Sequence, residues 1–287
     1  MQFLHPEHDE NLELALEDVF LVPRRFDGGS RLEVDLSPPD FRGGSHPVVS
    51  SNMNAVTGKR MAETMARYGG LGVLPQDMDL GTVERIVQHI RHADPRFDTA
   101  LSVKPSATLR DVLGIIWKRS HHMVVVVDDV GHPIGVVKPT DLRNRDQYTK
   151  VASLMSANTV TIPVGTSNRE AFLLMDEHRV NSVPVVGADG LLQGVLTKAD
   201  SVRLDLLKPT VDAAGHLMVA GAVGISADAA DTAAKLVDIG ISVVVLDTAH
   251  GHQRRMLETI EAVRAAIGDD VPLVAGNVCT AEGLSLI

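Results

Sequence analysis

The sequence predicts an α/β fold built on a parallel β-sheet. Short β-branched runs alternate with amphipathic helical stretches near both ends of the chain, and glycine and polar residues follow each predicted strand. Continuous apolar strands between helices are typical of parallel sheets that are covered by helices on both faces. An internal repeat interrupts this alternation in the middle of the chain, which predicts an inserted module.

The first part of the predicted sheet comes from residues 47–92. Pro47–Val49 is expected to form a strand, and Lys59–Tyr68 a helix that ends at a pair of glycines. A second strand is expected at Leu71–Leu74. The next helix is predicted by an apolar face at the spacing i, i+3, i+4, i+7, formed by Val83, Ile86, Val87 and Ile90.

The second part of the predicted sheet comes from the last eighty or so residues. Three further strands are expected at Leu217–Val223, Ser242–Leu246 and Pro272–Ala275. A helix at Ala227–Ile239 follows the first of them, and another carries Met256, Ile260, Val263 and Ile267 on one face. The closing Gly283–Ile287 is not expected to be helical. Polar residues gather after the carboxyl end of each strand, where ligands bind in barrels and open sheets of this kind.

The repeat consists of residues 99–141 and 158–200, which align without gaps at a constant offset of 59. Each copy is predicted to contain a helix, a strand, a glycine turn, a strand and a loop with aspartate. Two copies predict a pseudo-twofold pair with a cleft between them. The pairs of identical residues include Val124/Val183, Val126/Val185, Val127/Val186, Gly131/Gly190, Gly135/Gly194, Val136/Val195 and Asp141/Asp200.

The end of the second copy, Gly194–Asp200, admits two interpretations. The Thr197 hydroxyl could donate to a phosphate while the Asp200 carboxylate accepts from a ribose diol at a helix N-terminus. Alternatively, the two side chains only cap that helix. The first copy keeps Asp141 but has Lys138 in place of the threonine, so its site is less well supported.

Composition excludes several classes of function. The net charge of −10 opposes duplex nucleic acid and anionic membranes as partners, and the 3% aromatic content opposes a stacking platform for single strands. Cys279 is the single cysteine, which fits a reducing, cytoplasmic compartment. The acidic N-terminal stretch argues against a signal peptide, and the apolar runs are too short to cross a membrane. His89/His92 and His250/His252 lack a third ligand, so no metal site is expected.

The repeats resemble tandem CBS domains, because both copies end in glycine, two apolar residues, three further residues and then aspartate. That resemblance implies a regulatory nucleotide, ATP or GTP, held by Thr197 and Asp200, with a second one at Asp141. The expected domain limits are 94–152 for the first CBS domain and 153–208 for the second.

The flanking segments resemble the IMP dehydrogenase/GMP reductase family. The matching pieces occur in family order and are Leu16–Pro23, Glu33–Leu36, Ser50–Thr57, Gly69–Gly72, Asp247–Gly251 and Gly276–Val278. The resemblance implies a (β/α)8 TIM barrel, with strands 1–2 in residues 1–93 and strands 3–5 in residues 209–287. It looks closest to the CBS-containing actinobacterial branch.

The resemblance also assigns site residues. Ser51, Met53 and Asn277 would contact a purine 5′-nucleotide, and Asp247, Thr248 and Ala249 the nicotinamide end of the cofactor. Ser30 and Arg31 match the GMP reductase pattern at a cofactor contact, where an arginine can fork onto the phosphate of NADPH. In intact members the resemblance implies a homo-oligomer, a tetramer or octamer, with a possible monovalent cation.

The nucleophilic cysteine of that family lies on a loop after the sixth strand, beyond Ile287. We therefore expect a C-terminally truncated chain with no catalytic residue of its own, inactive alone and with part of its inner layer exposed. Cys279 is expected to be a small buried residue. The first functional interpretation is NADPH-dependent reductive deamination of GMP to IMP in purine salvage. The alternatives are NAD-dependent IMP dehydrogenase and a non-catalytic nucleotide sensor with a remnant barrel.

Overall fold

The structure is a computed structural model, and it describes residues 17, 19–23, 25, 27–38, 43–157 and 159–287. The chain divides into two units, Met1–Asp35 and Leu36–Ile287. The described part of the first unit contains a short 3-10 helix, η2 (Arg31–Glu33), whose Glu33 carboxylate accepts a hydrogen bond from the Gly29 N–H at 3.2 Å. All further elements belong to the second unit.

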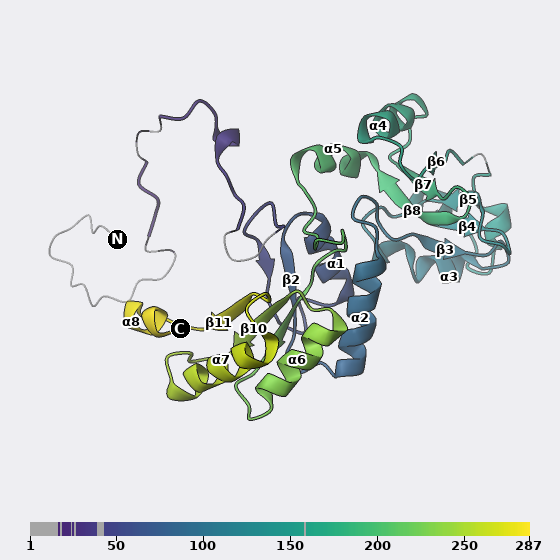
Figure 1. The fold of residues 1–287 in the computed structure, drawn as a ribbon. Helices are drawn as coiled ribbons and strands as arrows, with labels where there is room; N and C mark the ends of the chain where they lie inside the picture. The colour runs from purple at the N-terminus through teal and green to yellow at the C-terminus, as the bar shows by residue number, and fades with distance from the viewer. Residues whose placement is uncertain (1–16, 18, 24, 26, 39–42, 158) are drawn as a thin grey trace. The chain divides into compact units, whose positions relative to one another are not determined.

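A five-stranded sheet is the core of the second unit (Figure 1). Its strand order is β1-β2-β9-β10-β11, and every neighbouring pair is parallel. The strands span Val49–Ser50, Leu71–Leu74, Ala220–Val223, Val243–Asp247 and Leu273–Gly276. Parallel pairing requires crossover connections, which here are helices or the whole repeat region between β2 and β9.

The two faces of this sheet are both apolar, as the continuous apolar strands predict. Alternate residues point to opposite faces of a strand. One face packs on the helices through residues such as Leu74, Val219 and Val244. The other face forms a separate inner cluster of Leu71, Val73, Met218, Ala220, Ala222 and Val243. On the edge strands, Val49 and Val274 are 47% and 42% exposed.

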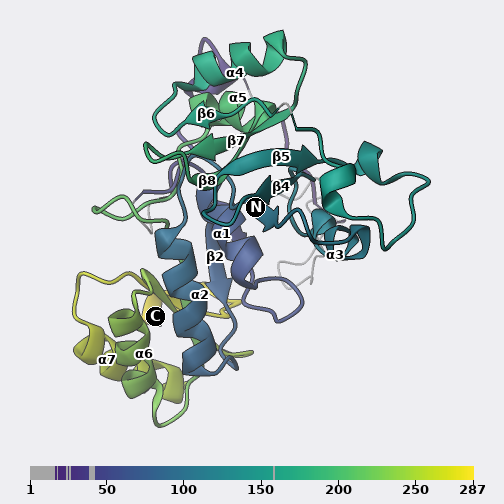
Figure 2. The same cartoon turned by 90° about the vertical axis from the view of Figure 1, so that its right-hand side faces the viewer.

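Within the described residues, the helices that accompany the strands are α1 (Lys59–Arg67), α2 (Leu80–His92), α6 (Ala229–Ile239), α7 (Arg254–Ile267) and α8 (Ala281–Leu286). Helices α2, α6 and α7 lie next to one another along the sheet (Figure 2). Asp79 caps α2 by accepting from the Thr82 N–H at 2.9 Å. Gly240 ends α6 in the left-handed conformation, with φ +110°, that favours glycine.

Helix α1 packs unusually close to β2. A Cβ atom on Gly72 would lie 2.5 Å from the Cα atom of Ala62, so only glycine permits this approach. Ala62 itself is fully buried. The contact holds the helix against the strand immediately after it in the chain, and it therefore fixes where the loop between β1 and α1 lies.

The repeat region forms two three-stranded sheets of the same topology, β3-β4-β5 and β6-β7-β8. In each, the first pair is parallel and the second antiparallel. The registers coincide when 59 is added: Val103 pairs with Val126 as Ile162 pairs with Val185. The strands span Leu101–Val103, Val124–Val127, Pro133–Val137, Ile162–Pro163, Ser182–Val186 and Leu192–Thr197.

The helical segments of the two copies differ in length. The first has α3 (Leu109–Leu113) and the 3-10 turns η3 (Ile116–Lys118), η4 (Pro139–Leu142) and η5 (Val151–Ser153). The second has α4 (Asn168–Glu177) and α5 (Lys198–Leu206). Capping boxes start both α3, at Thr108, and α4, at Ser167. A shared cluster that includes Met123, Val125 and Val195 packs the two copies together.

Some expectations about elements were wrong. The closing residues do form a helix, α8, because the Thr280 hydroxyl caps it by accepting from the Gly283 N–H at 3.0 Å. Each repeat also begins with a short strand, β3 or β6, before its helix. Strand β9 is shorter than expected, since regular pairing starts only at Ala220. None of the helices in the described part of the chain is long and apolar enough to span a membrane.

Candidate functional site

Most of the predicted substrate and cofactor residues lie where strands of the main sheet end. Ser51 and Met53 follow β1, Asp247 is the last residue of β10, and Asn277 follows β11 directly. The carboxyl ends of parallel strands meet at one edge of the sheet, which is the usual ligand edge in barrels and doubly wound folds. The structure thus collects these residues at one edge.

A hydrogen bond crosses this edge between strands that are not neighbours. The Asn52 side-chain amide donates to Asp247 Oδ2 at 2.7 Å, although β2 and β9 lie between β1 and β10. In a flat sheet these strands would be about 14 Å apart, at roughly 4.8 Å a step. Two short side chains span that distance only if the sheet curls. The parallel sheet is therefore curled in the manner of a barrel.

The loop after β1 is ordered by its own contacts. The Met53 N–H donates to Ser51 O at 2.8 Å, and the N–H groups of Val56 and Thr57 both donate to Met53 O. The buried Thr57 hydroxyl lies 2.6 Å from Ser51 O and 2.9 Å from Ser50 Oγ. These bonds satisfy the loop from within, so the side chain of Met53 stays 58% exposed and available to a ligand.

The loops after β10 and β11 are joined through their backbones. The Thr248 N–H donates to Gly276 O at 2.9 Å, and the Asn277 N–H donates to Thr248 O at 2.8 Å. The Gly251 N–H then donates to Asn277 O at 2.7 Å. Thr248 and Asn277 consequently form one rigid ledge, with exposed Ala249 beside Thr248.

Other predicted residues stand apart from this edge or differ from expectation. Ser30 and Arg31 belong to the Met1–Asp35 unit, where Arg31 is exposed at the start of η2, and their cofactor contact stays a prediction. Cys279 is exposed, so the expectation of a small buried residue was wrong. It lies in the connection between β11 and α8, at the solvent side of the strand ends, where packing does not reach it.

The predicted nucleotide residues of the second repeat cap a helix in this structure. Thr197 is the N-cap of α5, and its Oγ1 accepts from the Asp200 N–H at 3.0 Å while donating to Asp200 Oδ2 at 2.6 Å. In the first repeat, Asp141 Oδ2 accepts from the Lys138 N–H at 2.8 Å. Both carboxylates therefore begin a helical turn at the same position of their repeat.

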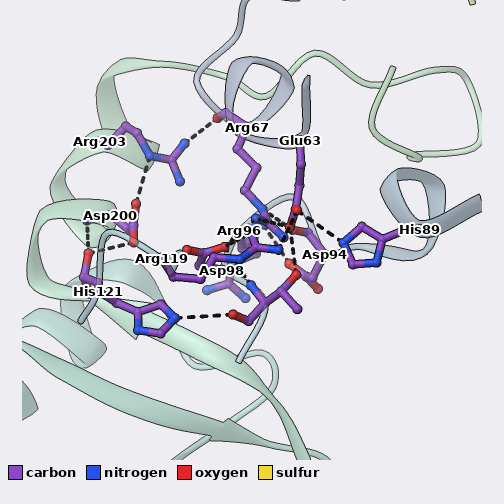
Figure 3. A network of polar contacts seen from close by, with 12 residues as sticks. Glu63, Arg67, His89, Asp94, Arg96, Asp98, Arg119, His121, Asp200 and Arg203 are labelled. Carbon is purple, nitrogen blue, oxygen red and sulfur yellow. Dashed lines mark hydrogen bonds and ion pairs between the residues drawn. The ribbon is translucent and has the colours of Figure 1, made fainter. Parts of the chain in front are cut away.

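Helix α1 and the repeat region meet in a buried ionic network (Figure 3). The Glu63 carboxylate, fully buried, accepts from Arg67 Nη1 at 2.6 Å and from Arg119 Nη2 at 2.8 Å. Both arginines also lie within 2.9 Å of Asp98 Oδ1. Thr99 donates to Glu63 at 2.7 Å, and His89 lies 3.3 Å from it. Charges buried this far from water persist only when paired in this way.

This network decides the ionisation of Glu63. Burial alone would raise its pKa, but the hydrogen bond from Arg119 and the charges of Arg67 and Arg119 outweigh burial and lower the pKa from 4.5 to about 2. Burial acts in the opposite sense on His121, which lies 3.3 Å from Thr99 O, and lowers its pKa. The junction therefore holds a carboxylate that stays charged throughout the neutral and mildly acidic range.

Asn52 and Glu63 were not predicted as site residues from the sequence. Asn52 lies in the Ser50–Thr57 segment, and its position after a strand was the available signal. For Glu63 the only local signal is Arg67 at i+4, a spacing that usually marks an exposed helix pair. Within the described residues no group of three or more His, Cys, Asp or Glu side chains could hold a metal ion.

Comparison with known proteins identifies the family. The family described as IMP dehydrogenase / GMP reductase domain matches residues 13–287. The chain belongs to this family. GMP reductase from Mycobacterium tuberculosis is 40% identical over 283 residues, covering 99% of this chain and 58% of that protein. An inosine-5′-monophosphate dehydrogenase of Halalkalibacterium halodurans is 31% identical over 274 residues, covering 94% and 56%.

Solved structures of the family are similar in fold. GMP reductase from Trypanosoma brucei in complex with guanosine 5′-monophosphate superimposes with a TM-score of 0.61 at 30% identity, over 92% of this chain and 58% of that chain. The same enzyme with guanosine 5′-triphosphate gives 0.61 at 29%, over 94% and 67%. The chain thus spans somewhat more than half the length of these family members. GMP reductase and IMP dehydrogenase are both oxidoreductases.

Proposed function

We propose that this chain is the nucleotide-binding part of a GMP reductase-type oxidoreductase, which converts GMP to IMP with NADPH. In that reaction C2 of the purine loses ammonia and gains a hydride, which the cofactor supplies. The observation that carries the proposal is the ligand edge of the curled sheet, in a chain 40% identical over nearly its whole length to a GMP reductase. The runner-up is IMP dehydrogenase, which relatives near 31% identity represent.

The residues at this edge suit a flat base and its ribose phosphate. Ser51 and exposed Met53 would contact the purine nucleotide, because a flexible thioether packs well on an aromatic ring. Asn277, on the adjoining ledge, would supply an amide that both donates and accepts. The task of these residues is to bind and orient the substrate, and Cys279 receives no catalytic role in this proposal.

The same edge fits a nicotinamide group. Asp247 is half-buried, and among the described residues only its Oδ2 has a hydrogen-bond partner, namely Asn52. Its Oδ1 can accept from a carboxamide N–H, with Thr248 and Ala249 beside it. We propose that Ser30 and Arg31 contact the extra phosphate of NADPH.

The test is an assay of the longest polypeptide that the gene of this chain encodes. NADPH oxidation with GMP supports the proposal, and NAD reduction with IMP supports the runner-up. If the enzyme catalyses neither reaction, both hypotheses are refuted. In the active enzyme, Asp247→Asn should raise KM for NADPH about tenfold, the cost of one hydrogen bond to a charged group. Asp77→Asn is the matched control, since Asp77 also accepts from an asparagine, Asn54, but at an exposed position.

A second function is proposed for the repeat region. We infer that the repeats are CBS domains and that Thr197 and Asp200 hold a regulatory ATP or GTP, with Asp141 as a second site. Two observations favour this: both carboxylates sit at equivalent helical turns of repeats with the same register, and the Trypanosoma brucei GMP reductase has been solved with guanosine 5′-triphosphate. The alternative, a non-catalytic nucleotide sensor, would bind nucleotide at the same site but would catalyse neither the GMP nor the IMP reaction.

Calorimetric titration of the 287-residue chain with ATP, GTP, GMP and IMP tests the regulatory site. We expect saturable binding of a triphosphate, weakened at least about tenfold by Asp200→Asn. Asp205→Asn, an exposed aspartate on the same helix that accepts only from Asn168 among the described residues, should leave affinity within about twofold. Equal affinity of the Asp200→Asn variant and the parent would refute the placement of the ligand. We also propose that the intact protein forms a tetramer or octamer, as the family resemblance implies.

A further inference from the structure

Arg203 connects the second repeat to helix α1. Its side chain is only 7% exposed and has three partners. The Nε atom lies 3.2 Å from Asp200 Oδ1, and Nη1 donates to the backbone oxygen of Arg67 (Figure 3). The guanidinium also lies 4.6 Å from the centroid of the Tyr68 ring. One buried side chain therefore joins the proposed nucleotide site to the end of a barrel helix.

The contact with Arg67 completes the C-terminus of α1. The last four carbonyl groups of a helix have no partner within the helix and carry a partial negative charge. The Ala66 carbonyl accepts from the N–H groups of Gly69 and Thr210. The Arg67 carbonyl, the last of the helix, accepts from Arg203 instead. A cation is the favoured partner at this end of a helix, so this cap depends on a residue 136 positions later in the chain.

Both oxygens of the Asp200 carboxylate have a hydrogen-bond partner in this structure. Its Oδ2 accepts from Thr197 and its Oδ1 from Arg203, and its side chain is 14% exposed. A ribose diol that binds this carboxylate would compete for the same oxygens. Arg203 bonds to Asp200 through Nε and to the end of α1 through Nη1. A ligand that weakens the bond to Asp200 would therefore change the hydrogen bond from Arg203 to the Arg67 carbonyl.

Helix α1 extends from this cap to the substrate loop. It has nine residues, about 13 Å of helix, and it starts at Lys59, just after the loop closed by Thr57. The repeats grip it elsewhere too, since Arg60 Nη1 donates to Lys118 O at 2.6 Å and Glu63 pairs with Arg119. A change at the last turn of α1 can therefore be carried as a rigid-body shift to Ser51 and Met53.

Among the described residues, only the second repeat joins its aspartate to the end of α1 through an arginine. The residue of the first repeat that corresponds to Arg203 at the offset of 59 is Asn144. Asp141 accordingly accepts from its own Lys138 N–H and Thr140 hydroxyl, and not from an arginine, within the part of the chain that the structure describes. The two otherwise similar sites are thus unequal, and Asp141 provides a natural control.

We propose that Arg203 is a positioning residue that transmits nucleotide occupancy at Thr197–Asp200 to helix α1 and, through it, to the Ser51–Thr57 loop. The proposal rests on the proposed regulatory nucleotide site. It adds which of the two proposed nucleotide sites is connected to helix α1, and through which side chain.

A double-mutant cycle on the ligand-free 287-residue chain tests the connection itself. Amide hydrogen exchange of peptides covering residues 60–70 is compared among Arg203→Lys, Asp200→Asn and the double variant. Each single variant should raise exchange in the last turn of α1 about fivefold, and the double variant no further, because both changes break one chain of contacts. Asp141→Asn should leave this turn unchanged. Additive effects, or no effect of Asp200→Asn, would overturn the proposal.

The same exchange measurement with nucleotide bound tests whether occupancy of the Thr197–Asp200 site is transmitted to α1. At saturating ATP or GTP, the parent chain should show faster exchange in the last turn of α1 and altered exchange in residues 50–58, and Arg203→Lys should bind the nucleotide without this response. An unchanged response in Arg203→Lys overturns the transmission alone. Absence of calorimetric binding in the parent refutes the regulatory function and the transmission together.

The lysine variant keeps the charge but loses the forked geometry of the guanidinium. Far-UV circular dichroism and the melting temperature establish that it folds. If the Arg203→Lys variant does not fold, the exchange measurement without nucleotide is made on Asp200→Asn alone. That variant preserves the size of the side chain and leaves Arg203 in place.

Discussion

Asn52 and Asp247 are joined by a 2.7 Å hydrogen bond across a sheet in which their strands are separated by two others. The bond closes the proposed substrate loop after β1 onto the proposed cofactor carboxylate at the end of β10. It therefore contributes both to the curvature of the sheet and to the geometry of the ligand edge, and its removal should affect stability and site together.

Asn52→Ala should lower the free energy of unfolding by about 1–2 kcal/mol, because Asp247 loses a partner in a half-buried place. Asn54→Ala is the control, since Asn54 donates to Asp77 at 2.6 Å on the exposed surface and should cost less than about 0.5 kcal/mol. Urea denaturation of both variants measures the difference. Equal losses of unfolding free energy in the two variants would show that the Asn52–Asp247 bond stabilises the protein no more than an exposed hydrogen bond does.

Glu63→Gln should be far more damaging than its size suggests. The change leaves Arg67 and Arg119 buried with Asp98 as their remaining carboxylate, and we expect a loss of about 3–5 kcal/mol in the free energy of unfolding. Glu258→Gln removes an exposed pair with Arg254 and should cost less than about 0.5 kcal/mol. A cost for Glu63→Gln as small as that of the control would contradict a structural role for the network.

Stability should also depend on pH through Glu63. Its folded pKa of about 2 lies below the ordinary 4.5, so the unfolded chain takes up a proton first as pH falls. The stabilisation, about 3 kcal/mol from the size of this shift, is present above pH 4.5 and is lost between there and about pH 2. Melting temperatures measured across this range should fall more steeply for the parent than for Glu63→Gln. Parallel curves would argue against the shift.

Gly72→Ala should destabilise the five-stranded sheet and its helices by about 1–3 kcal/mol, because the new methyl group would meet the Ala62 backbone at 2.5 Å and force α1 away from β2. Gly81→Ala, in the first turn of α2, meets nothing nearer than 3.4 Å and should be neutral or stabilising by up to about 1 kcal/mol. Thermal unfolding of the two variants compares them. A tolerated methyl group at position 72 would mean that the close approach of helix and strand is not required.

Local pattern was sufficient for much of this protein. The apolar runs located the five parallel strands to within a few residues, because a strand buried on both faces must be apolar throughout. The helical spacings located α1, α2, α6 and α7 but not α8. The repeat offset of 59 reappears in the strand registers, since identical valines and glycines occupy identical places in the two small sheets. Polar residues after the predicted strands indicated a ligand edge, because parallel strands end at a common edge. The family resemblance, and not the pattern alone, assigned Ser51, Asp247 and Asn277 to it.

Contacts between distant parts of the chain could not be read in this way. Nothing near Asn52 indicates Asp247, because their proximity depends on the curl of the whole sheet. Glu63 and Arg67 look like an exposed i, i+4 pair until Arg119 and Asp98 are folded against them and exclude water. Arg203 caps a helix that ends 136 residues earlier. Sequence spacing sets which side chains share a face of one element, but which elements meet, and hence which charges are buried together, depends on packing across the chain.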